Sequence, residues 1–476
     1  MKRANLLTAL FCLCFVTVMW AQPDHPGVVP TRTVTGTRIG HYKDGAVPVD
    51  LSIRTIAALV PGATGGYNVI TGTGTTSGTF SISNVPFGYY LLQLGGRYLW
   101  TKNTVVNADY DSGVRSTEVL AGENTTLTFN LRHLNPWQSN DLLEFINTST
   151  GAFQLYTGTD GATTFTGTYP YTNYLSDASQ GDMTYLLQLA TQEVGGYPFD
   201  SIARFFQIPL TQVDGVDTTI GAWLPTVSQA RAFRANIAGA DLAAQALAAN
   251  PGATLTSTVV ALDVYPGSLA KGFIVATPDL VGYDFNNDVT PLTVNADLGD
   301  VMYGNPFPRS FELFVIYSYQ AQTNYLLPGT TQSGPISTSA YGYTPAIPTA
   351  TTPIAPMIGT ISNPAVNGGD FFADRSGIGF SPTLTWVPPQ VGRANLYIVR
   401  VYDLISNAGV TVPTLVAILQ TQGTSIRIPA NLMLAGQTYV FQITPEYRPS
   451  VNVAVNPYKF GPTRAFADVL SGMMQP

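Results

Sequence analysis

The sequence predicts an all-β protein made of β-sandwiches in tandem, with one helix in its middle domain. Short stretches of alternating apolar and polar residues recur along the chain, separated by Gly, Pro, Asn and Asp, which is the pattern of half-buried strands joined by turns. Gly (45), Pro (34), Tyr (25) and Phe (23) are plentiful, whereas charged residues make up only 11%, as expected of a strand-rich extracellular protein. With 45% hydrophobic residues among 476, the chain can bury the cores of more than one domain.

Residues 1–21 have the pattern of a secretory signal peptide. Lys2 and Arg3 precede an apolar stretch over residues 6–18, and Ala21 provides the small residue before the cleavage site. This apolar stretch is shorter than the roughly 20 residues that a membrane-spanning helix needs, so cleavage is favoured over a membrane anchor. A Pro-rich leader follows over residues 22–32. No later stretch can span a membrane, so no transmembrane segment is expected after cleavage.

Cysteine content and net charge indicate the compartment and exclude one class of partner. Both cysteines, Cys12 and Cys14, lie inside the signal segment, so the cleaved chain would contain none. A secreted animal protein of this size would usually carry disulfides, so their absence indicates a bacterial protein that is secreted or held at the cell surface. The net charge of -7 argues against binding to nucleic acid.

The first domain is predicted over residues 33–132. It opens at Gly36, turns at Asp44-Gly45, and continues through residues 78–94, where the alternation places Phe80 and Ile82 inside. A strand near its end, over residues 124–131, is expected to close the unit. The stretch from Gly78 to Tyr89 resembles the Gly-x-Phe-x-Ile-x-Asn-Val-Pro-x-Gly-x-Tyr motif of the carboxypeptidase regulatory-like, transthyretin-like domain. This resemblance implies a small β-sandwich that accompanies other domains and has no catalytic residues of its own.

The middle domain is predicted over residues 133–343 and resembles no family that we recognise. Short apolar stretches indicate that it is rich in strands. Within it, apolar residues repeat at intervals of three and four and predict one helix near residues 227–249, which ends at Asn250-Pro251-Gly252. A Pro/Thr linker over residues 344–356 is expected to separate this domain from the next as a semi-rigid spacer.

The C-terminal domain, predicted over residues 357–464, has the most regular strand pattern. Leu384 and Trp386 share one face of a strand, and two further strands carry apolar faces at residues 397–401 and 439–443. These strands and the Gly436-x-x-Tyr439 step resemble fibronectin type III, an immunoglobulin-like sandwich. The resemblance implies that the Tyr439 hydroxyl bonds back to the backbone and that Trp386 lies in the core. Residues 465–476 are expected to form a tail.

Residues that carry catalysis are scarce in this chain. Its three histidines are His25, His41 and His133, and the sequence has neither a His-x-x-x-His pair nor a Gly-x-Ser-x-Gly elbow, so zinc and serine hydrolases are disfavoured. Two carboxylates could still hydrolyse a glycoside. No spacing selects two of the middle-domain candidates, which are Glu193, Asp200, Asp214, Asp263, Asp279 and Glu312. We therefore expect no catalytic residues, no cofactor and no enzymatic activity.

Two kinds of ligand contact are candidates. Asp284, Asn286 and Asp288 offer several oxygen ligands within five residues and could bind calcium, as could the shorter Asp109–Gly113 loop. Neither loop supplies the roughly six to eight oxygens that calcium needs, so an Asx-rich turn is the favoured interpretation. Aromatic side chains could stack on glycans, and the candidates are Tyr169, Tyr171 and Tyr174 around Pro170, with the tryptophans Trp100, Trp137 and Trp223. Ordinary strand and turn packing is the alternative for these residues.

These observations favour an exported, non-enzymatic β-protein that acts at the cell surface or beyond it. Adhesion, scaffolding or envelope assembly would suit such a protein, with a surface protein or a polysaccharide as its partner. The alternative is a carbohydrate-binding protein or a glycan-active enzyme whose site lies in the middle domain. Exposed aromatic residues beside two carboxylates in that domain would favour the alternative.

Overall fold

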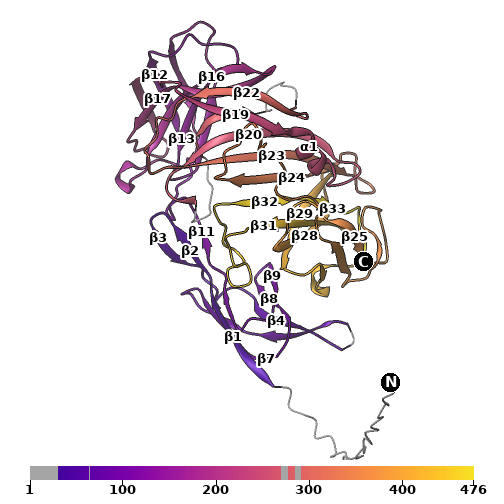
Figure 1. The fold of residues 1–476 in the computed structure, drawn as a ribbon. Helices are drawn as coiled ribbons and strands as arrows, with labels where there is room; N and C mark the ends of the chain where they lie inside the picture. Colours follow the sequence, from indigo (N-terminus) through magenta and orange to yellow (C-terminus); the bar gives the residue numbers. More distant parts are fainter. Residues whose placement is uncertain (1–29, 64, 270–276, 285–290) are drawn as a thin grey trace, which may run out of the picture.

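The computed structural model describes residues 30–63, 65–269, 277–284 and 291–476. It confirms the all-β class, since strands make up nearly all of the regular structure and the described residues contain a single α-helix (Figure 1). No helix in these ranges is long and apolar enough to cross a membrane. The predicted signal peptide and most of the leader lie outside the described residues.

The N-terminal module is a sandwich of short strands. Its strands are β1 (Thr31–Thr37), β2 (Ile39–Tyr42), β3 (Gly45–Pro48), β4 (Ile56–Pro61), β5 (Tyr67–Thr71), β6 (Thr73–Gly74), β7 (Thr79–Pro86), β8 (Tyr90–Leu94), β9 (Arg97–Thr101), β10 (Val105–Asn107) and β11 (Tyr110–Asp111). The sheet β10-β1-β7-β6 faces the strands β4, β5, β8 and β9 across one hydrophobic core. Phe80 and Ile82 are 3% and 0% exposed in that core, which confirms the predicted strand register.

The middle module is larger and has several layers. Its elements are β12 (Thr126–Arg132), β13 (Leu142–Asn147), β14 (Ala152–Tyr156), β15 (Thr164–Pro170), the 3-10 helix η1 (Ala178–Gln180), β16 (Thr184–Val194), β17 (Tyr197–Ile208), β18 (Asp217–Trp223), β19 (Arg231–Ala238), α1 (Gly239–Leu247), β20 (Thr254–Tyr265), β21 (Asp279–Asp284), β22 (Asn295–Tyr303), β23 (Glu312–Tyr325) and β24 (Gly334–Thr344). One long sheet includes β13, β16, β17, β20, β23 and β24. Part of this sheet packs on β12, β15 and β18 across one hydrophobic core. The sheet packs on β19, β22 and α1 across a second core.

The C-terminal module is a second sandwich. Its elements are β25 (Ser362–Val366), β26 (Gly369–Asp370), β27 (Thr383–Val387), β28 (Leu396–Asn407), β29 (Val410–Thr421), β30 (Ser425–Arg427), the 3-10 helix η3 (Ala430–Leu432), β31 (Thr438–Tyr447), β32 (Arg464–Ala467) and β33 (Val469–Leu470). The small sheet β26-β25-β27-β30 packs against β28, β29 and β31. Trp386 and Tyr439 are buried between them, as the sequence pattern predicts.

Strand pairing joins the three modules into one continuous sheet. β32 pairs antiparallel with β24 of the middle module and with β31 of its own module. On the other side, β29 pairs in parallel with β9 of the N-terminal module, with Ile418 opposite Arg97. The C-terminal module therefore lies between the other two in space, although it comes last in the chain (Figure 1).

The predicted helix over residues 227–249 is wrong in its first half. Residues Arg231–Ala238 form strand β19, which pairs with β22, and only Gly239–Leu247 is helical. Phe233 and Ile237 are four residues apart, a spacing that fits the helical period and also the two-residue period of a strand. Ala235 is 0% exposed between them, so the strand period is the one that the fold adopts. The helix itself buries Leu242 and Ala246.

Three segments at predicted boundaries are parts of neighbouring layers. β12, expected to close the first domain, pairs with β15 and β18 in the middle module. The expected linker over residues 344–356 docks on β19, because the Ile354 N–H donates to the Asn236 carbonyl at 2.8 Å. The expected tail over residues 465–476 contains most of β32 and all of β33, and its Met474 is fully buried. Hydrogen-bonding partners far away in the sequence hold each of these segments, and local composition does not reveal such partners.

Candidate anion-binding cleft

The predicted calcium ligands receive little support. Asn286 and Asp288 lie outside the described residues, and Asp284 ends strand β21. In the second loop, Asp109 accepts hydrogen bonds from the Thr37 hydroxyl and the Ile39 N–H. Across the described part of the chain, no group of three or more His, Cys, Asp or Glu side chains is arranged to hold a metal ion.

The tyrosines predicted to form an exposed glycan platform do not form one. Tyr171 is 1% exposed and donates its hydroxyl to the Tyr174 carbonyl at 2.6 Å. Tyr169 is half-buried, with its ring 4.9 Å from that of Tyr156 and stacked on that of Phe165. Tyr174 remains as the exposed member of the three, at 37%. Tyr171 is part of a hydrophobic core and Tyr169 packs against it, so these two rings serve packing, the alternative interpretation of the sequence.

Two of the six candidate carboxylates in the middle module meet in its interior. Pairing of β20 with β21 places Asp263 opposite Asp279, and the two side chains hydrogen-bond each other, which requires a proton on one of them. Glu144 of β13, which the sequence did not single out, interacts with the same Asp279. Burial, and then the charge of Asp279, raises the pKa of both Glu144 and Asp263 well above the ordinary values. Their side chains are 2% and 3% exposed, whereas Asp279 is half-buried.

The carboxyl cluster predicts that raising the pH destabilises the protein. The ordinary pKa values are 4.5 for Glu144 and 3.8 for Asp263, and the folded values are higher. The stabilisation is therefore complete below about pH 4 and is lost as the pH rises through the folded pKa values. Thermal melting measured from pH 4 to pH 8 should show a falling melting temperature, and Glu144→Gln with Asp263→Asn should flatten the slope. Glu193→Gln, at an exposed carboxylate of β16, is the control, and a wild-type profile without this slope would contradict the prediction.

Six arginines meet at a cleft between the N-terminal and C-terminal modules. One cavity of about 310 Å³ is lined by Arg38, Arg54 and Arg97. An adjoining cavity of about 430 Å³ shares Arg38, Arg97 and Ile418 with the first, and it is also lined by Arg400, Arg448 and Arg464. We call the two together the arginine cleft. The chain as a whole is acidic, with 22 Lys and Arg against 29 Asp and Glu. The lining of the arginine cleft has the opposite sign, since it contains six arginines and one acidic residue, Asp111.

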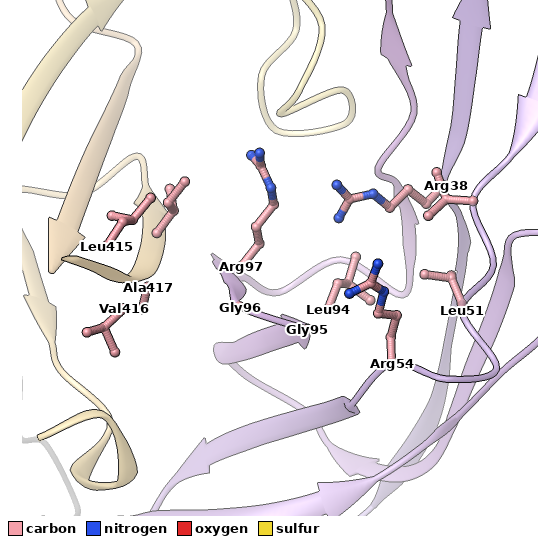
Figure 2. A pocket seen from close by; sticks show the side chains of 12 residues that line it. Arg38, Leu51, Arg54, Leu94, Gly95, Gly96, Arg97, Leu415, Val416 and Ala417 are labelled. Atoms are coloured by element: carbon pink, nitrogen blue, oxygen red, sulfur yellow. The ribbon is translucent and has the colours of Figure 1, made fainter. Parts of the chain in front are cut away.

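The N-terminal wall of the cleft is set by the strands of the first module. Arg38 is the single residue between β1 and β2, and Arg54 lies before β4. Arg97 opens β9, where the parallel pairing with β29 fixes it opposite Ile418. Figure 2 shows the guanidinium groups of Arg38, Arg54 and Arg97 projecting into the space that faces the C-terminal strand with Leu415.

None of these three arginines forms a salt bridge in the described part of the chain. Arg54 nevertheless lies close to Asp50, and the pKa of that carboxyl group is lowered by hydrogen bonds from a nearby serine and then by the charge of Arg54. Arg38 and Arg97 instead lie 5.9 and 5.7 Å from the ring centroid of Tyr458, and the Arg38 Nε is buried without a hydrogen-bond partner. Burial, and then the charge of Arg97, lowers the pKa of Arg38. A bound anion would relieve this repulsion and satisfy the free donors.

On the C-terminal wall of the cleft, Arg448 and Arg464 form salt bridges with the buried carboxylate of Glu446. Glu446 is fully buried, and its Oε1 lies 2.6 Å from the Arg464 Nη2 while its other oxygen pairs with Arg448. Burial by itself would raise the pKa of Glu446, but the two arginines outweigh it and hold the pKa at about 2. One carboxylate thus faces two guanidinium groups, and the excess positive charge faces the cleft. Gln420, which also lines the cleft, is 3% exposed and leaves its Oε1 without a partner.

The loop between β31 and β32 fixes the two walls relative to each other. Its Tyr458 packs into the core of the N-terminal module. Its Lys459 pairs with Asp111 at 3.2 Å, so the acidic lining residue is already neutralised. The guanidinium forks of the cleft suit carboxylate, sulfate or phosphate groups, and the rings of Tyr110, Tyr458 and Phe460 add flat walls.

Sequence reasoning missed these arginines because they belong to no local motif. They come from opposite ends of the chain, and only the pairing of β9 with β29 brings the two groups together. The available signal was indirect, namely that few cations occur in the chain and that several of them lie close to aromatic residues in the last segment, as at Arg448, Tyr458, Phe460 and Arg464.

Comparison with known proteins adds little to this site. No protein-family model matches the sequence, and comparison with curated proteins gives no match. Among solved structures, one match is the crystal structure of a tetra-tandem repeat in the extending region of a large adhesion protein. It has 11% sequence identity, covers 92% of this chain and 99% of that chain, and has a TM-score of 0.11. A TM-score of this size does not establish a common fold.

Proposed function

We propose that this protein is an exported, non-enzymatic β-protein that binds an acidic polysaccharide in the arginine cleft. Adhesion, scaffolding or envelope assembly at the cell surface would be its role. The observation that carries the proposal is the convergence of Arg38, Arg54 and Arg97, none of which forms a salt bridge within the described residues, on a wall where Glu446 holds two more arginines. The pattern of residues 1–21 supports export.

A polysaccharide fits the cleft better than a single small anion. The two adjoining cavities present separate groups of guanidinium donors, so a polymer with repeated carboxylate or sulfate groups could engage both at once. The apolar and aromatic side chains between the arginines, such as Ile418, Tyr110 and Tyr458, offer contacts for the sugar rings that carry those groups.

The burial of Glu144 and Asp263 favours a role in binding over a role in catalysis. A glycoside hydrolase needs two carboxyl groups that flank the scissile bond of its substrate. Asp263 and Glu144 are 3% and 2% exposed, and Glu193, Asp214 and Glu312 lie exposed at other positions of the middle module. The arrangement of these carboxylates therefore favours a structural part for the middle module.

Replacing Arg38 and Arg97 together by glutamine should abolish most of the binding. A hydrogen bond to a charged group contributes about 1.5–3 kcal/mol, so we expect the affinity for oligogalacturonate or dextran sulfate to fall roughly a hundredfold or more. Isothermal titration calorimetry of the purified protein would measure it, and binding should weaken as salt is added. Arg231→Gln, at an exposed arginine of β19, is the matched control.

Four results would contradict this proposal. The double variant could bind both polyanions as tightly as the wild type, or neutral dextran could bind as well as dextran sulfate. The wild type could also bind polyglutamate and neither polysaccharide, which would make the ligand an acidic protein. Turnover of a polysaccharide by the purified protein would overturn its non-enzymatic nature.

A further inference from the structure

A second pair of cavities lies against Trp100, at the other end of the β9–β29 seam. One, of about 460 Å³, is lined by Tyr67, Trp100, Thr383, Ser425 and Arg427, with Pro61. The other, of about 300 Å³, is also lined by Trp100, together with Tyr89, Lys102, Asn103 and Gln422. Trp100 therefore lines both cavities. Neither of them shares a lining residue with the arginine cleft.

The strand alternation places Trp100 away from the arginine cleft. Successive residues of β9 point to opposite faces of the sheet. Arg97 lines the arginine cleft, and Leu99 points to the same face, into the core of the N-terminal module. Tyr98 and Trp100 point to the other face and pack against the core that contains Trp386. A ligand at Trp100 is thus independent of one at Arg97.

The rings at Trp100 are held in place by their neighbours. Trp100 stacks on Tyr89, with 5.6 Å between ring centroids and 10° between ring planes, and Tyr89 is 51% exposed. Tyr67 donates its hydroxyl to the Arg427 carbonyl at 3.1 Å, which fixes that ring at the side of the larger cavity. A fixed, flat and partly exposed ring loses little entropy when a ligand stacks on it.

Polar groups around these rings remain able to bind a ligand. Arg427 forms no salt bridge within the described residues, and its Nε is buried without a hydrogen-bond partner. Thr383 and Ser425 line the same cavity with hydroxyl groups. Lys102 and Gln422 provide donors in the smaller cavity. Each cavity thus combines an aromatic wall with several hydrogen-bonding groups, and the larger volume suits one or two sugar rings.

We propose that Trp100 is the platform of a carbohydrate-binding site for neutral pyranose rings. The apolar face of a pyranose would stack on Trp100 in the larger cavity, while Thr383, Ser425 and Arg427 bind its hydroxyl groups. A peptide would form few hydrogen bonds with these hydroxyl groups and the guanidinium group, whereas a sugar carries hydroxyl groups all around its ring. The proposal rests on the aromatic cavities alone and stands whether or not the arginine cleft binds a polyanion.

The test is titration of the purified protein with neutral oligosaccharides, using cellohexaose, xylohexaose, mannohexaose and laminarihexaose as probes. The wild type should bind at least one of them, with a change in tryptophan fluorescence. Trp100→Ala should weaken that binding by about tenfold or more, and Trp100→Phe should retain part of it. Ser425→Phe, at an exposed position that lines the cavity, should block binding without removing a packed ring, which keeps the test valid if Trp100→Ala fails to fold.

Two control variants test whether the neutral probe binds at Trp100 itself. Trp223→Ala removes a different tryptophan, 57% exposed and stacked on His133, and should leave the affinity unchanged. The Arg38→Gln and Arg97→Gln double variant should also bind the neutral probe normally, even if it loses polyanions. The proposal is overturned if none of the four probes binds, or if Trp100→Ala and Ser425→Phe bind as the wild type does.

Discussion

Replacing Trp386 by alanine is expected to lower the free energy of unfolding by about 3–5 kcal/mol. The side chain is 5% exposed, and its ring centroid lies 5.2 Å from that of Tyr397. Alanine would leave a cavity between the two sheets of the C-terminal module, because the surrounding strands are tied by ladder hydrogen bonds and can relax only partly. Net stabilities of single domains are about 5–15 kcal/mol, so the loss is a large part of the total.

The same substitution should destabilise the N-terminal module as well. The core around Trp386 also contains Leu59, Leu91 and Tyr98 of the first module, and β9 pairs with β29. We therefore expect one joint shift of melting temperature, with amide hydrogen exchange in β8 and β9 accelerated together with that in β28 and β29. Trp223→Ala, at an exposed tryptophan, should change neither quantity. Unaltered exchange in β8 and β9 would show that the two modules unfold independently.

The sequence pattern suggests that the modules are independent. The structure corrects this expectation, because one continuous sheet runs through all three. Each sandwich is visible locally, since alternation alone places Phe80, Leu384 and Phe441 in cores where the structure buries them. The corner bond implied by the fibronectin resemblance is also present, with the Leu434 N–H donating to the Tyr439 hydroxyl at 2.8 Å. Period and turn chemistry determine such features over a few residues, and for that reason they can be read from one sequence.

The way in which the sandwiches join could not be predicted. The pairings of β24 with β32 and of β9 with β29 connect segments that are far apart in the sequence, and backbone hydrogen bonds leave no trace in residue identity. The candidate site depends on these same pairings. Arg97 and Arg464 meet across the cleft only because the last strands of the chain insert between the first and middle modules. The candidate site therefore depends on strand pairing between modules, which the pattern within any one domain does not predict.

Glu446→Gln is expected to lower the free energy of unfolding by a comparably large amount, because it leaves Arg448 and Arg464 without their carboxylate partner. Glu446 and Arg448 are 0% and 2% exposed, and removing one partner of a buried ion pair costs about 3–5 kcal/mol. Urea denaturation of both proteins would measure the difference. Asp297→Asn is the matched control, since it makes the same change in the half-exposed pair with Arg234 and should leave stability nearly unaltered. Equal effects of the two substitutions would contradict this account.

The pH dependence gives a second signature of Glu446. Its folded pKa of about 2 lies below its ordinary value of 4.5, so its stabilisation is present above about pH 4.5 and is lost as the pH falls toward about 2. As the pH falls between these limits, the wild type should lose stability. Glu446→Gln should lose less, because it has no carboxyl group at position 446 to be protonated. This is opposite in sign to the effect of Glu144 and Asp263, which weakens the protein as the pH rises. Adding Arg464→Gln to Glu446→Gln should recover part of the lost stability, because it removes one of the two uncompensated charges. The two side chains are not coupled if the double variant is instead less stable than Glu446→Gln by the full cost of a second buried substitution.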